Sequence, residues 1–339
     1  MIPGSDRTVA IVAIGRNEGD RLKSCLAAVL AGGSIVVYVD SGSSDGSAEY
    51  ARSIGCNVLE LDPMRPFSAA RARNEGFARA MELEPDAAFV QFLDGDCTLV
   101  DHWLETGIAA LIERQDVGIV CGHVNEVHPE ASVYNRLSDL EWQQTPGEAR
   151  SAGGRFMIRS EVFSAAGGFR PDVIAAEDDE LCIRVRGLGW KILVLDVPMA
   201  MHDLAMTRFS EWWLRTRRTG HAYAHVAALH GKGEERYFVR DCRKVWLWAL
   251  ILPISALLLA PVTRGLSLLA LLGLYALQFC RIYLGAKRRG WKTPDAVIYA
   301  FFTVVGKFPM LEGLFDYHWR QRRGHAMTII EYKGSKSSQ

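Results

Sequence analysis

The chain has 339 residues, in which 39 lysines and arginines are balanced by 39 aspartates and glutamates. A chain with no net positive charge and no recognisable nucleic-acid module is not expected to bind nucleic acid. Its seven cysteines are scattered without a C-x-x-C motif, which favours reduced cytoplasmic thiols over a disulfide framework. The length suits one α/β domain of roughly 230 residues and a second module of roughly 90 residues.

The first third of the chain alternates between strand and helix patterns. Residues 9–14 are apolar and partly β-branched, which predicts a buried strand, and a helical pattern follows up to Gly32-Gly33. Residues 35–39 predict a second strand that ends at Asp40, and a loop over residues 41–47 opens the next helix. The short connections predict a Rossmann-like α/β fold, with a mostly parallel sheet and helices on both faces.

Asp94-Gly95-Asp96 follows the apolar run at residues 87–93. A buried strand that ends here directs both carboxylates to the edge where open α/β sheets bind ligands. Carboxylates suit Mg²⁺ or Mn²⁺, whose coordination is usually completed by substrate phosphates. The alternative is a surface turn, because Asp-Gly is a common turn pair. The chain has neither a G-x-G-x-x-G after its first strand nor a P-loop motif, so metal and arginine would have to hold a phosphate.

A second acidic cluster covers residues 177–180 and follows a glycine-containing loop at residues 167–171, which comes after a predicted strand at residues 156–158. Such clusters are common at helix N-termini, where the helix dipole favours them, so a purely structural role is the alternative. His202 follows a predicted strand at residues 191–195 and is either a metal ligand or a structural histidine. His221 and His225 lack the glutamate of an H-E-x-x-H motif, and we expect them on a helix surface.

Taken in order, these motifs resemble those of family 2 glycosyltransferases with the GT-A fold. The resemblance covers roughly residues 7–225 and rests on residues 11–18, 39–47, 72–76, 94–96, 167–169 and 177–184, and on His202 with the arginine-rich stretch after it. In one departure, Ser41 stands where many members have a second aspartate. The resemblance implies a nucleotide-sugar donor, a Mn²⁺ or Mg²⁺ cofactor and a D-x-D motif at Asp94 and Asp96.

The resemblance also assigns roles to residues of the donor and metal sites. Donor-binding residues would be Asn17, Glu18, Asp40, Arg73 and Asp94. Asp40 would contact the nucleoside, and Arg73 would bind a phosphate through two hydrogen bonds, with Arg71 as a competing candidate. Asp96 would bind the metal, with Asp94 close by and His202 completing the site.

Asp178 would be the catalytic base that deprotonates the acceptor hydroxyl, with Asp179 or Glu180 as alternatives. One base without an obvious enzyme nucleophile favours a single displacement with inversion. Glu177, Trp213 and Arg217 are further candidates for contacts with the acceptor or the diphosphate. The stretch at residues 212–218 mixes aromatic and cationic side chains and is interpreted as a diphosphate clamp, an acceptor platform or a membrane-surface anchor.

The last third contains long apolar stretches. Residues 245–262 and 265–280 carry no charge, which predicts membrane spans at about 245–262 and 265–284, with a buried helical hairpin as the alternative. Basic residues flank both spans, so the positive-inside rule places both flanks and the catalytic domain in the cytoplasm. Residues 296–315 are expected to form an interfacial helix or a third span. The polar start of the chain argues against a signal peptide.

The sequence thus predicts a GT-A catalytic domain at residues 1–240, a membrane module at 241–333 and a disordered tail at 334–339. The predicted protein is a multi-pass enzyme of the cell (inner) membrane. It would be a metal-dependent inverting glycosyltransferase acting on a lipid-linked or glycan acceptor in surface polysaccharide or glycolipid biosynthesis. The alternatives are a nucleotidyltransferase on a similar fold and a catalytically silent membrane-tethered binding subunit.

Overall fold

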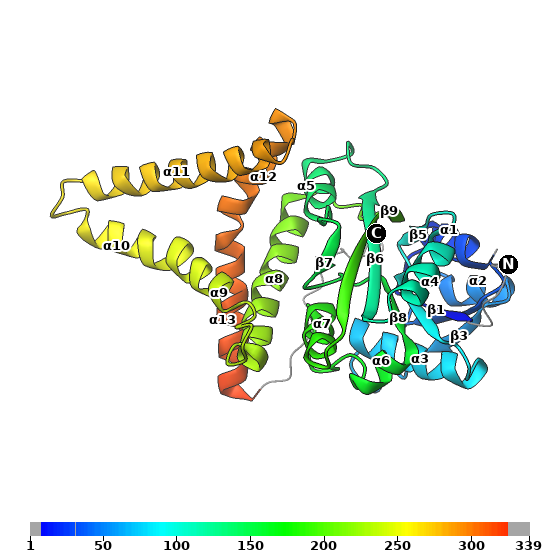
Figure 1. Cartoon of the computed structure of the whole chain (residues 1–339). Coiled ribbons are helices and arrows are strands. Elements are labelled where there is room, and N and C mark those ends of the chain that lie inside the picture. Colours follow the sequence, from blue (N-terminus) through cyan, green and yellow to red (C-terminus); the bar gives the residue numbers. More distant parts are fainter. Residues whose placement is uncertain (1–7, 31, 325–339) are drawn as a thin grey trace. The chain divides into compact units, whose positions relative to one another are not determined.

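The computed structural model describes residues 8–30 and 32–324 (Figure 1). The described chain forms two compact units. The first contains the described residues up to Val127 and Trp142–Leu204, and the second contains His128–Glu141 and the described residues from Ala205 onward. The predicted tail at 334–339 lies outside the described residues, and the predicted boundary at residue 240 stays a prediction.

The first unit is built on one mixed sheet. Its strands are β1 (Val9–Gly15), β2 (Ile35–Asp40), β3 (Asn57–Glu60), β4 (Phe89–Asp94), β5 (Cys97–Leu99), β6 (Val117–Glu126), β7 (Gly147–Ala149), β8 (Phe156–Arg159) and β9 (Lys191–His202). They are ordered β3-β2-β1-β4-β8-β6-β9-β5, and β7 also pairs with β9. The pairs among β3, β2, β1 and β4 are parallel, whereas β8 runs antiparallel to both of its neighbours.

Helices cover the sheet. They are α1 (Asp20–Leu30), α2 (Ser47–Ser53), α3 (Ala69–Leu83), α4 (Trp103–Glu113), α6 (Ser160–Ala165) and α7 (Glu177–Gly187). Helix α3 packs on β1 and β2 through Gly76, where an added Cβ would collide with Val12 and Val39. Strands β1, β2 and β4 are buried along almost their whole length, which explains their uninterrupted apolar sequences. The predicted mostly parallel α/β sheet is confirmed.

The second unit is helical. It contains α5 (Val133–Glu141), α8 (Phe209–His230), α9 (Val239–Trp246), the π-helical segment η1 (Leu247–Ile251), α10 (Leu252–Leu259), α11 (Leu266–Arg288), α12 (Thr293–Val305) and α13 (Lys307–Arg323). Helices α8 and α13 cross in very close contact. An added Cβ at Gly220 would collide with the Met310 backbone, and one at Gly313 would collide with the Arg217 carbonyl.

The predicted surface position of His221 and His225 is wrong. Both side chains lie on α8 and are buried, with 0% and 5% of their surface exposed. Helix α13 covers this part of α8 and places Tyr317 against both imidazole rings. Burial lowers the pKa of His221 to about 4, so the ring is neutral at physiological pH.

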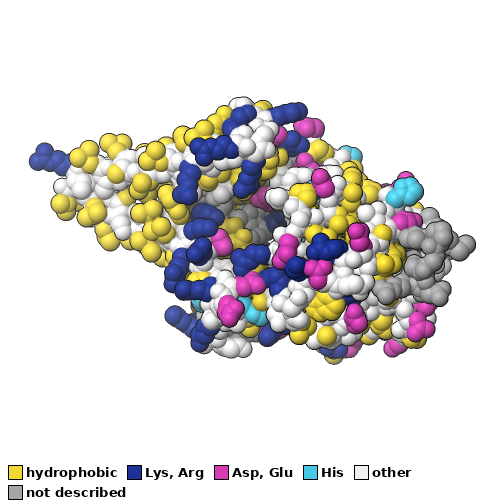
Figure 2. Space-filling model, viewed as in Figure 1, with side chains coloured by type: hydrophobic (Ala, Val, Ile, Leu, Met, Phe, Trp, Pro, Cys, Tyr) yellow, Lys and Arg dark blue, Asp and Glu magenta, His cyan; other side chains and the backbone are white. Residues whose placement is uncertain are grey.

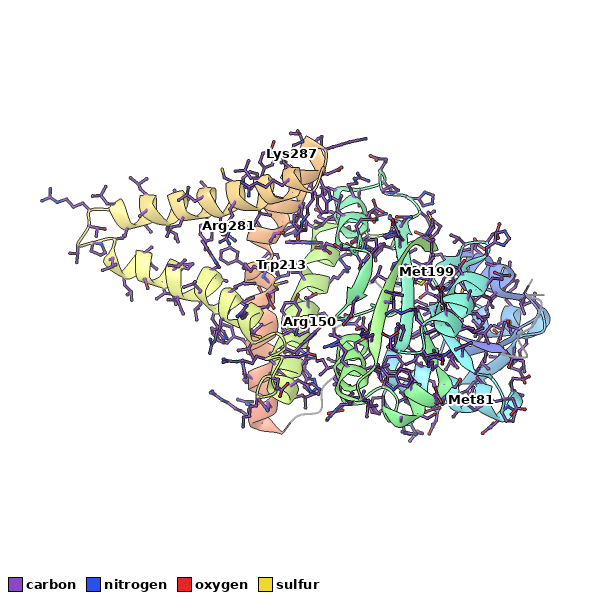
Figure 3. The ribbon with its side chains drawn as sticks, in the orientation of Figure 1. Met81, Arg150, Met199, Trp213, Arg281 and Lys287 are labelled. Atoms are coloured by element: carbon purple, nitrogen blue, oxygen red, sulfur yellow. The ribbon has the colours of Figure 1, made fainter. Side chains whose placement is uncertain are left out.

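Three segments of the described chain are long and apolar enough to cross a membrane, by length and composition: Val239–Leu259, Leu266–Arg288 and Thr293–Arg323. The first begins before the predicted start at residue 245 and contains η1, whose Trp248 carbonyl accepts a hydrogen bond from Tyr275 Oη at 2.5 Å. Figure 2 shows hydrophobic side chains covering α10 and α11. In Figure 3, Arg281 and Lys287 lie toward the end of α11 that is far from the α10–α11 turn.

Candidate active site

The carboxyl ends of three parallel strands meet at one edge of the first unit. The pairing register sets Gly15 of β1 beside Asp40 of β2, and Ile14 of β1 beside Asp94 of β4. The two aspartates therefore flank the end of the same strand. This edge is where ligands bind in open α/β sheets.

Asp40 is buried, and its carboxylate accepts hydrogen bonds from its own loop and from strand β2. It accepts hydrogen bonds from the backbone N–H groups of Gly42 (3.0 Å) and Ser43 (2.7 Å), from Ser43 Oγ (2.6 Å) and from Tyr38 Oη (3.1 Å). Burial and the neighbouring Asp40 raise the pKa of Tyr38, so its hydroxyl stays protonated and donates. Asp40 thus fixes the 41–47 loop, and its predicted nucleoside contact stays a prediction.

The neighbouring predicted donor-binding residues join the same loop to the end of β1. The Asn17 side-chain oxygen accepts from the Ser44 N–H at 2.8 Å, and the Asn17 N–H donates to Ser43 Oγ at 2.9 Å. Glu18 pairs with Arg21 at 2.8 Å. The Asn17 contacts hold two loops together at the carboxyl edge of the sheet, whereas the Glu18–Arg21 pair lies within one of them.

Arg73 connects the end of β4 to the start of α7. Its Nη2 lies 2.7 Å from Asp94 Oδ1, and its Nη1 lies 2.7 Å from Glu177 Oε1. The Arg73 side chain is 3% exposed, and its Nε has no hydrogen-bond partner. The competing candidate Arg71 instead binds Glu75 and the backbone carbonyls of the preceding loop, which is a structural role. The predicted phosphate contact of Arg73 stays a prediction.

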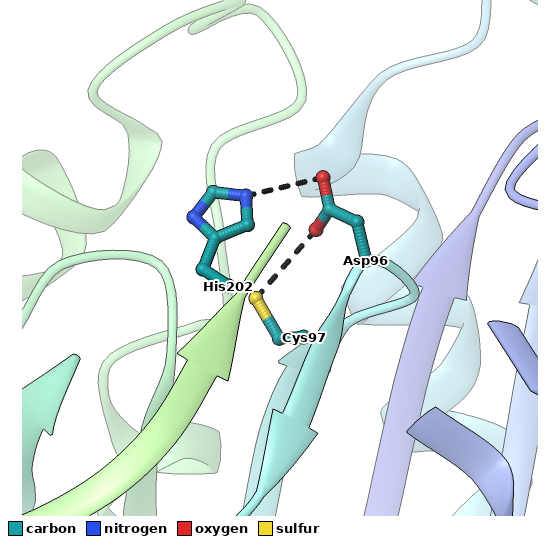
Figure 4. A group of neighbouring side chains, drawn as sticks. All are labelled: Asp96, Cys97 and His202. Carbon is teal, nitrogen blue, oxygen red and sulfur yellow. Dashed lines mark hydrogen bonds and ion pairs between the residues drawn. The ribbon is translucent and has the colours of Figure 1, made fainter. Parts of the chain in front are cut away.

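Asp96, Cys97 and His202 form a buried cluster of metal-ligating side chains (Figure 4). His202 Nε2 lies 3.1 Å from Asp96 Oδ2, and Cys97 Sγ lies 3.5 Å from Asp96 Oδ1. One ligand atom from each residue lies within 4.8 Å of the others. The cluster arises because β5 pairs with β9 and sets Cys97 opposite His202.

The chemistry of this donor set fits a divalent cation. Carboxylate and imidazole are ligands that Mn²⁺ accepts, and carboxylate suits Mg²⁺. Burial raises the pKa of the Cys97 thiol, so Cys97 offers a thiol rather than a thiolate. Asp94, predicted beside the metal, is not in this cluster, and its carboxylate pairs with Arg73 and Arg155.

Asp178 lies in the first turn of α7, directly after the arginine-bound Glu177. Burial, together with the neighbouring Asp179 and Glu177, raises the pKa of Asp178 to about 7, while Arg73 acts in the opposite direction. A carboxyl with this pKa can accept a proton near neutral pH. The alternative base Glu180 is fully buried and paired with Arg184 at 2.5 Å.

Two residues beside the Asp96–Cys97–His202 cluster were missed from the sequence. Arg155 Nη1 lies 3.3 Å from Asp94 Oδ2 and 3.2 Å from His202 Nδ1. The Trp142 ring stacks on His202 with 4.4 Å between ring centroids. Neither residue belongs to a motif, and only the folded sheet brings them to His202.

Trp213 and Arg217, the weaker predicted candidates, belong to the second unit. Trp213 Nε1 on α8 donates to Glu312 Oε2 at 3.1 Å, and Arg217 Nη2 lies 3.5 Å from Asp316 Oδ1 (Figure 3 labels Trp213). Within that unit, both side chains pair with acidic residues of α13.

Comparison with known proteins gives a consistent result. The profile of the family described as "Glycosyl transferase family 2" matches residues 9–173. The chain is 24% identical to the glycosyltransferase AglE of Haloferax volcanii over 72% of this chain and 80% of that protein. It is 27% identical to the pre-mycofactocin glycosyltransferase of Mycobacterium tuberculosis over 67% of this chain and 49% of that protein. The chain thus spans about half the length of the latter relative.

A solved structure has the same fold. It is a mannosyltransferase, PcManGT from Pyrobaculum calidifontis, in complex with GDP-Man and Mn²⁺. The two chains share 17% identity and superpose with a TM-score of 0.63, covering 94% of this chain and 89% of the other.

Proposed function

We propose that this chain, a glycosyltransferase of family 2 by its profile match over residues 9–173, carries out a metal-dependent, inverting transfer of a sugar from a nucleotide sugar to an acceptor hydroxyl. The observation that carries the proposal is the Arg73 bridge. It joins Asp94, at the carboxyl edge of the sheet, to Glu177, the residue before the proposed base. The groups for the donor and for the acceptor hydroxyl thereby belong to one connected site.

Asp96 and His202 would hold the cation, with Cys97 within ligand reach. We propose Mn²⁺ or Mg²⁺, and a protein of the same fold was solved with Mn²⁺. When bound, the ion would neutralise charge on the diphosphate that leaves.

Asp178 would accept the proton of the acceptor hydroxyl. The hydroxyl oxygen forms a bond to the anomeric carbon as the bond to the diphosphate oxygen breaks, and the nucleoside diphosphate leaves with that electron pair. A positioned base typically contributes about 10²–10⁴-fold to such a step. One base and one displacement give inversion at the anomeric carbon.

We further propose that the acceptor is lipid-linked or a membrane-associated glycan, and that the enzyme is a multi-pass protein of the cell (inner) membrane. The proposal is supported by the three candidate spans and by basic side chains on both sides of the apolar hairpin: Arg240, Arg243, Lys244, Lys287, Arg288 and Arg289. By the positive-inside rule these flanks lie in the cytoplasm, together with the catalytic domain. Surface polysaccharide or glycolipid assembly is the corresponding process.

The test is release of nucleoside diphosphate from a panel of nucleotide sugars by the purified chain in detergent, with Mn²⁺ and with chelator. We expect one donor to be turned over only with metal, and Asp96→Asn and Asp178→Asn to lose that turnover. Asp172→Asn is the matched control, because Asp172 pairs with Arg170 on the surface. Metal-independent turnover, or full activity of Asp96→Asn, would overturn the proposal.

A further inference from the structure

Arg155 occupies a position that bears directly on metal binding. Its side chain is 12% exposed, and its Nη1 reaches both Asp94 Oδ2 (3.3 Å) and His202 Nδ1 (3.2 Å). Its guanidinium also lies over the Trp142 ring, 5.5 Å from the centroid. The same indole stacks on His202, so Arg155 and His202 share one aromatic neighbour.

The contact between Arg155 and His202 fixes the imidazole tautomer. A guanidinium donates hydrogen bonds and has no acceptor, so His202 Nδ1 must present its lone pair. The proton of the neutral ring then lies on Nε2, where it faces Asp96 Oδ2 at 3.1 Å. Both ring nitrogens are therefore engaged, and neither has a lone pair free for a metal.

Ligation by His202 is incompatible with this arrangement on either side of the ring. A cation on Nδ1 would take the position of the Arg155 donor. A cation on Nε2 would require the proton to move to Nδ1. The Nδ1–H would then face an N–H of the Arg155 guanidinium, and two donors cannot form a hydrogen bond. The guanidinium must leave His202 before His202 can ligate.

We propose that Arg155 is a positioning residue that competes with the divalent cation for His202. It releases the imidazole when the phosphates of a nucleoside diphosphate accept its guanidinium. Phosphate oxygens accept paired, charge-assisted hydrogen bonds from a guanidinium, which are stronger than a hydrogen bond to a neutral imidazole nitrogen. Metal and nucleotide would then bind cooperatively, and the cation alone would bind weakly. The inference rests on the proposed metal-dependent function and adds the residue that couples the two ligands.

The test measures Mn²⁺ affinity of the full chain in detergent from the electron paramagnetic resonance signal of free Mn²⁺. Arg155→Met and the milder Arg155→Gln are compared with wild type, and Arg114→Met is the control because Arg114 pairs with Asp116 on the surface. Without nucleotide, we expect both Arg155 variants to bind Mn²⁺ about tenfold more tightly, the equivalent of one charge-assisted hydrogen bond. Affinity equal to or weaker than wild type in both folded variants would overturn the proposal.

Adding UDP or GDP tests the coupling. We expect the nucleotide to tighten Mn²⁺ binding to wild type by a larger factor than to the Arg155 variants. Equal factors would overturn the coupling.

Variants made in a His202→Gln background distinguish an effect of Arg155 through the His202 tautomer from simple charge repulsion between Arg155 and the cation. If Arg155 acts through His202, Arg155→Gln should gain little Mn²⁺ affinity in that background. An undiminished gain would show that Arg155 acts on the carboxylates alone and would overturn the role of His202. A cation bound at Nε2, the ring nitrogen that faces Asp96, should change the His202 signal in ¹⁵N-histidine spectra from Nε2-protonated to Nδ1-protonated when Mg²⁺ and UDP or GDP are added.

These readouts do not require sugar transfer. A chain that binds Mn²⁺ in this manner without turning over any nucleotide sugar would contradict the proposed function and leave the role of Arg155 intact. A chain that transfers sugar with unchanged metal affinity in the Arg155 variants would contradict only the role of Arg155.

Discussion

Arg73 Nη1 lies 2.7 Å from Glu177 Oε1, so the residue directly before the proposed base is bound by an arginine from another helix. The other terminal nitrogen of the same guanidinium binds Asp94 at 2.7 Å. One buried side chain therefore sets the distance between the end of β4 and the first turn of α7. In the proposed function, the donor and acceptor parts of the site therefore depend on each other through Arg73.

Arg73→Met should destabilise the first unit and abolish activity. Removal of the guanidinium leaves two carboxylates near each other with no cation between them, and breaking a buried pair in this way costs about 3–5 kcal/mol. The melting temperature of the purified chain in detergent measures the effect. Arg79→Met is the control on the same helix, because Arg79 forms an exposed pair with Glu82 and should change stability by less than about 1 kcal/mol. Equal melting temperatures for the two variants would contradict the structural role of Arg73.

The pH dependence of kcat/KM should report Asp178. Because the pKa of Asp178 is raised to about 7, the free enzyme needs a pH above 7 to hold the base deprotonated. We expect kcat/KM to fall about tenfold per pH unit below that value. The residual activity of Asp178→Asn should not show this decrease in kcat/KM at low pH, whereas the activity of Asp172→Asn should show it. If kcat/KM of Asp178→Asn still decreases below pH 7, the ionisation belongs to another group.

The raised pKa of Asp178 also makes the stability of the folded chain depend on pH. A carboxyl whose pKa is raised in the folded chain binds its proton more tightly there than in the unfolded chain. The contribution of Asp178 to stability is therefore complete below about pH 4, the unfolded value, and is lost as the pH rises through about 7. Asp178→Asn should remove this decline, so its melting temperature relative to wild type should rise between pH 5 and pH 8. A constant difference would show that the carboxyl is not shifted.

Gly220→Ala and Gly313→Ala should each be strongly destabilising. An added Cβ at either position collides with the backbone of the opposite helix, so α8 and α13 must separate, and overpacking of this kind typically costs about 1–3 kcal/mol or more. Gly273→Ala is the control, because nothing lies within 4 Å of its added Cβ and alanine favours the helix by about 1 kcal/mol over glycine. Melting curves should shift downward for the first two variants and not for the third.

Asp295→Ala should loosen α5 from α12. Arg136 donates to both Asp295 oxygens, at 2.8 and 2.7 Å, and a partly exposed bidentate pair is worth about 1 kcal/mol. Because Arg136 also pairs with Asp139 at 3.1 Å, the double variant with Arg136→Ala should lose little more stability than Arg136→Ala alone. If the losses of the two single variants simply add, the pair contributes nothing as a pair.

The parts of this fold that could be predicted from sequence are those with local causes. Strands β1, β2 and β4 appear as apolar runs because they are buried on both faces. Asp94 and Asp96 were predicted at the carboxyl edge because they follow such a run directly. The sheet class was predicted from these patterns and is confirmed. The family was predicted from the order of the motifs, and the family 2 profile matches residues 9–173.

The parts that sequence patterns missed depend on pairing between distant segments. Strand β9 extends to His202, beyond its apolar start, and its pairing with β5 alone sets His202 opposite Cys97. Arg155 and Trp142 reach that histidine from segments with no recognisable signal. His221 and His225 were predicted as surface residues because they lack the glutamate of an H-E-x-x-H motif, and that local pattern does not reveal that α13 packs over them.

Helix α5 has a practical consequence for anyone who wishes to obtain a soluble catalytic fragment. The chain leaves the first unit after Val127, forms α5 within the second unit, and returns at Trp142. Truncation after Leu204 would remove the partners of Arg136 and Ser138 on α12 and α8. The amphipathic helix α5 would then remain in the fragment without the helices against which it packs. A fragment made by a single cut should therefore aggregate, and a usable one requires that residues 128–141 be replaced by a polar linker as well.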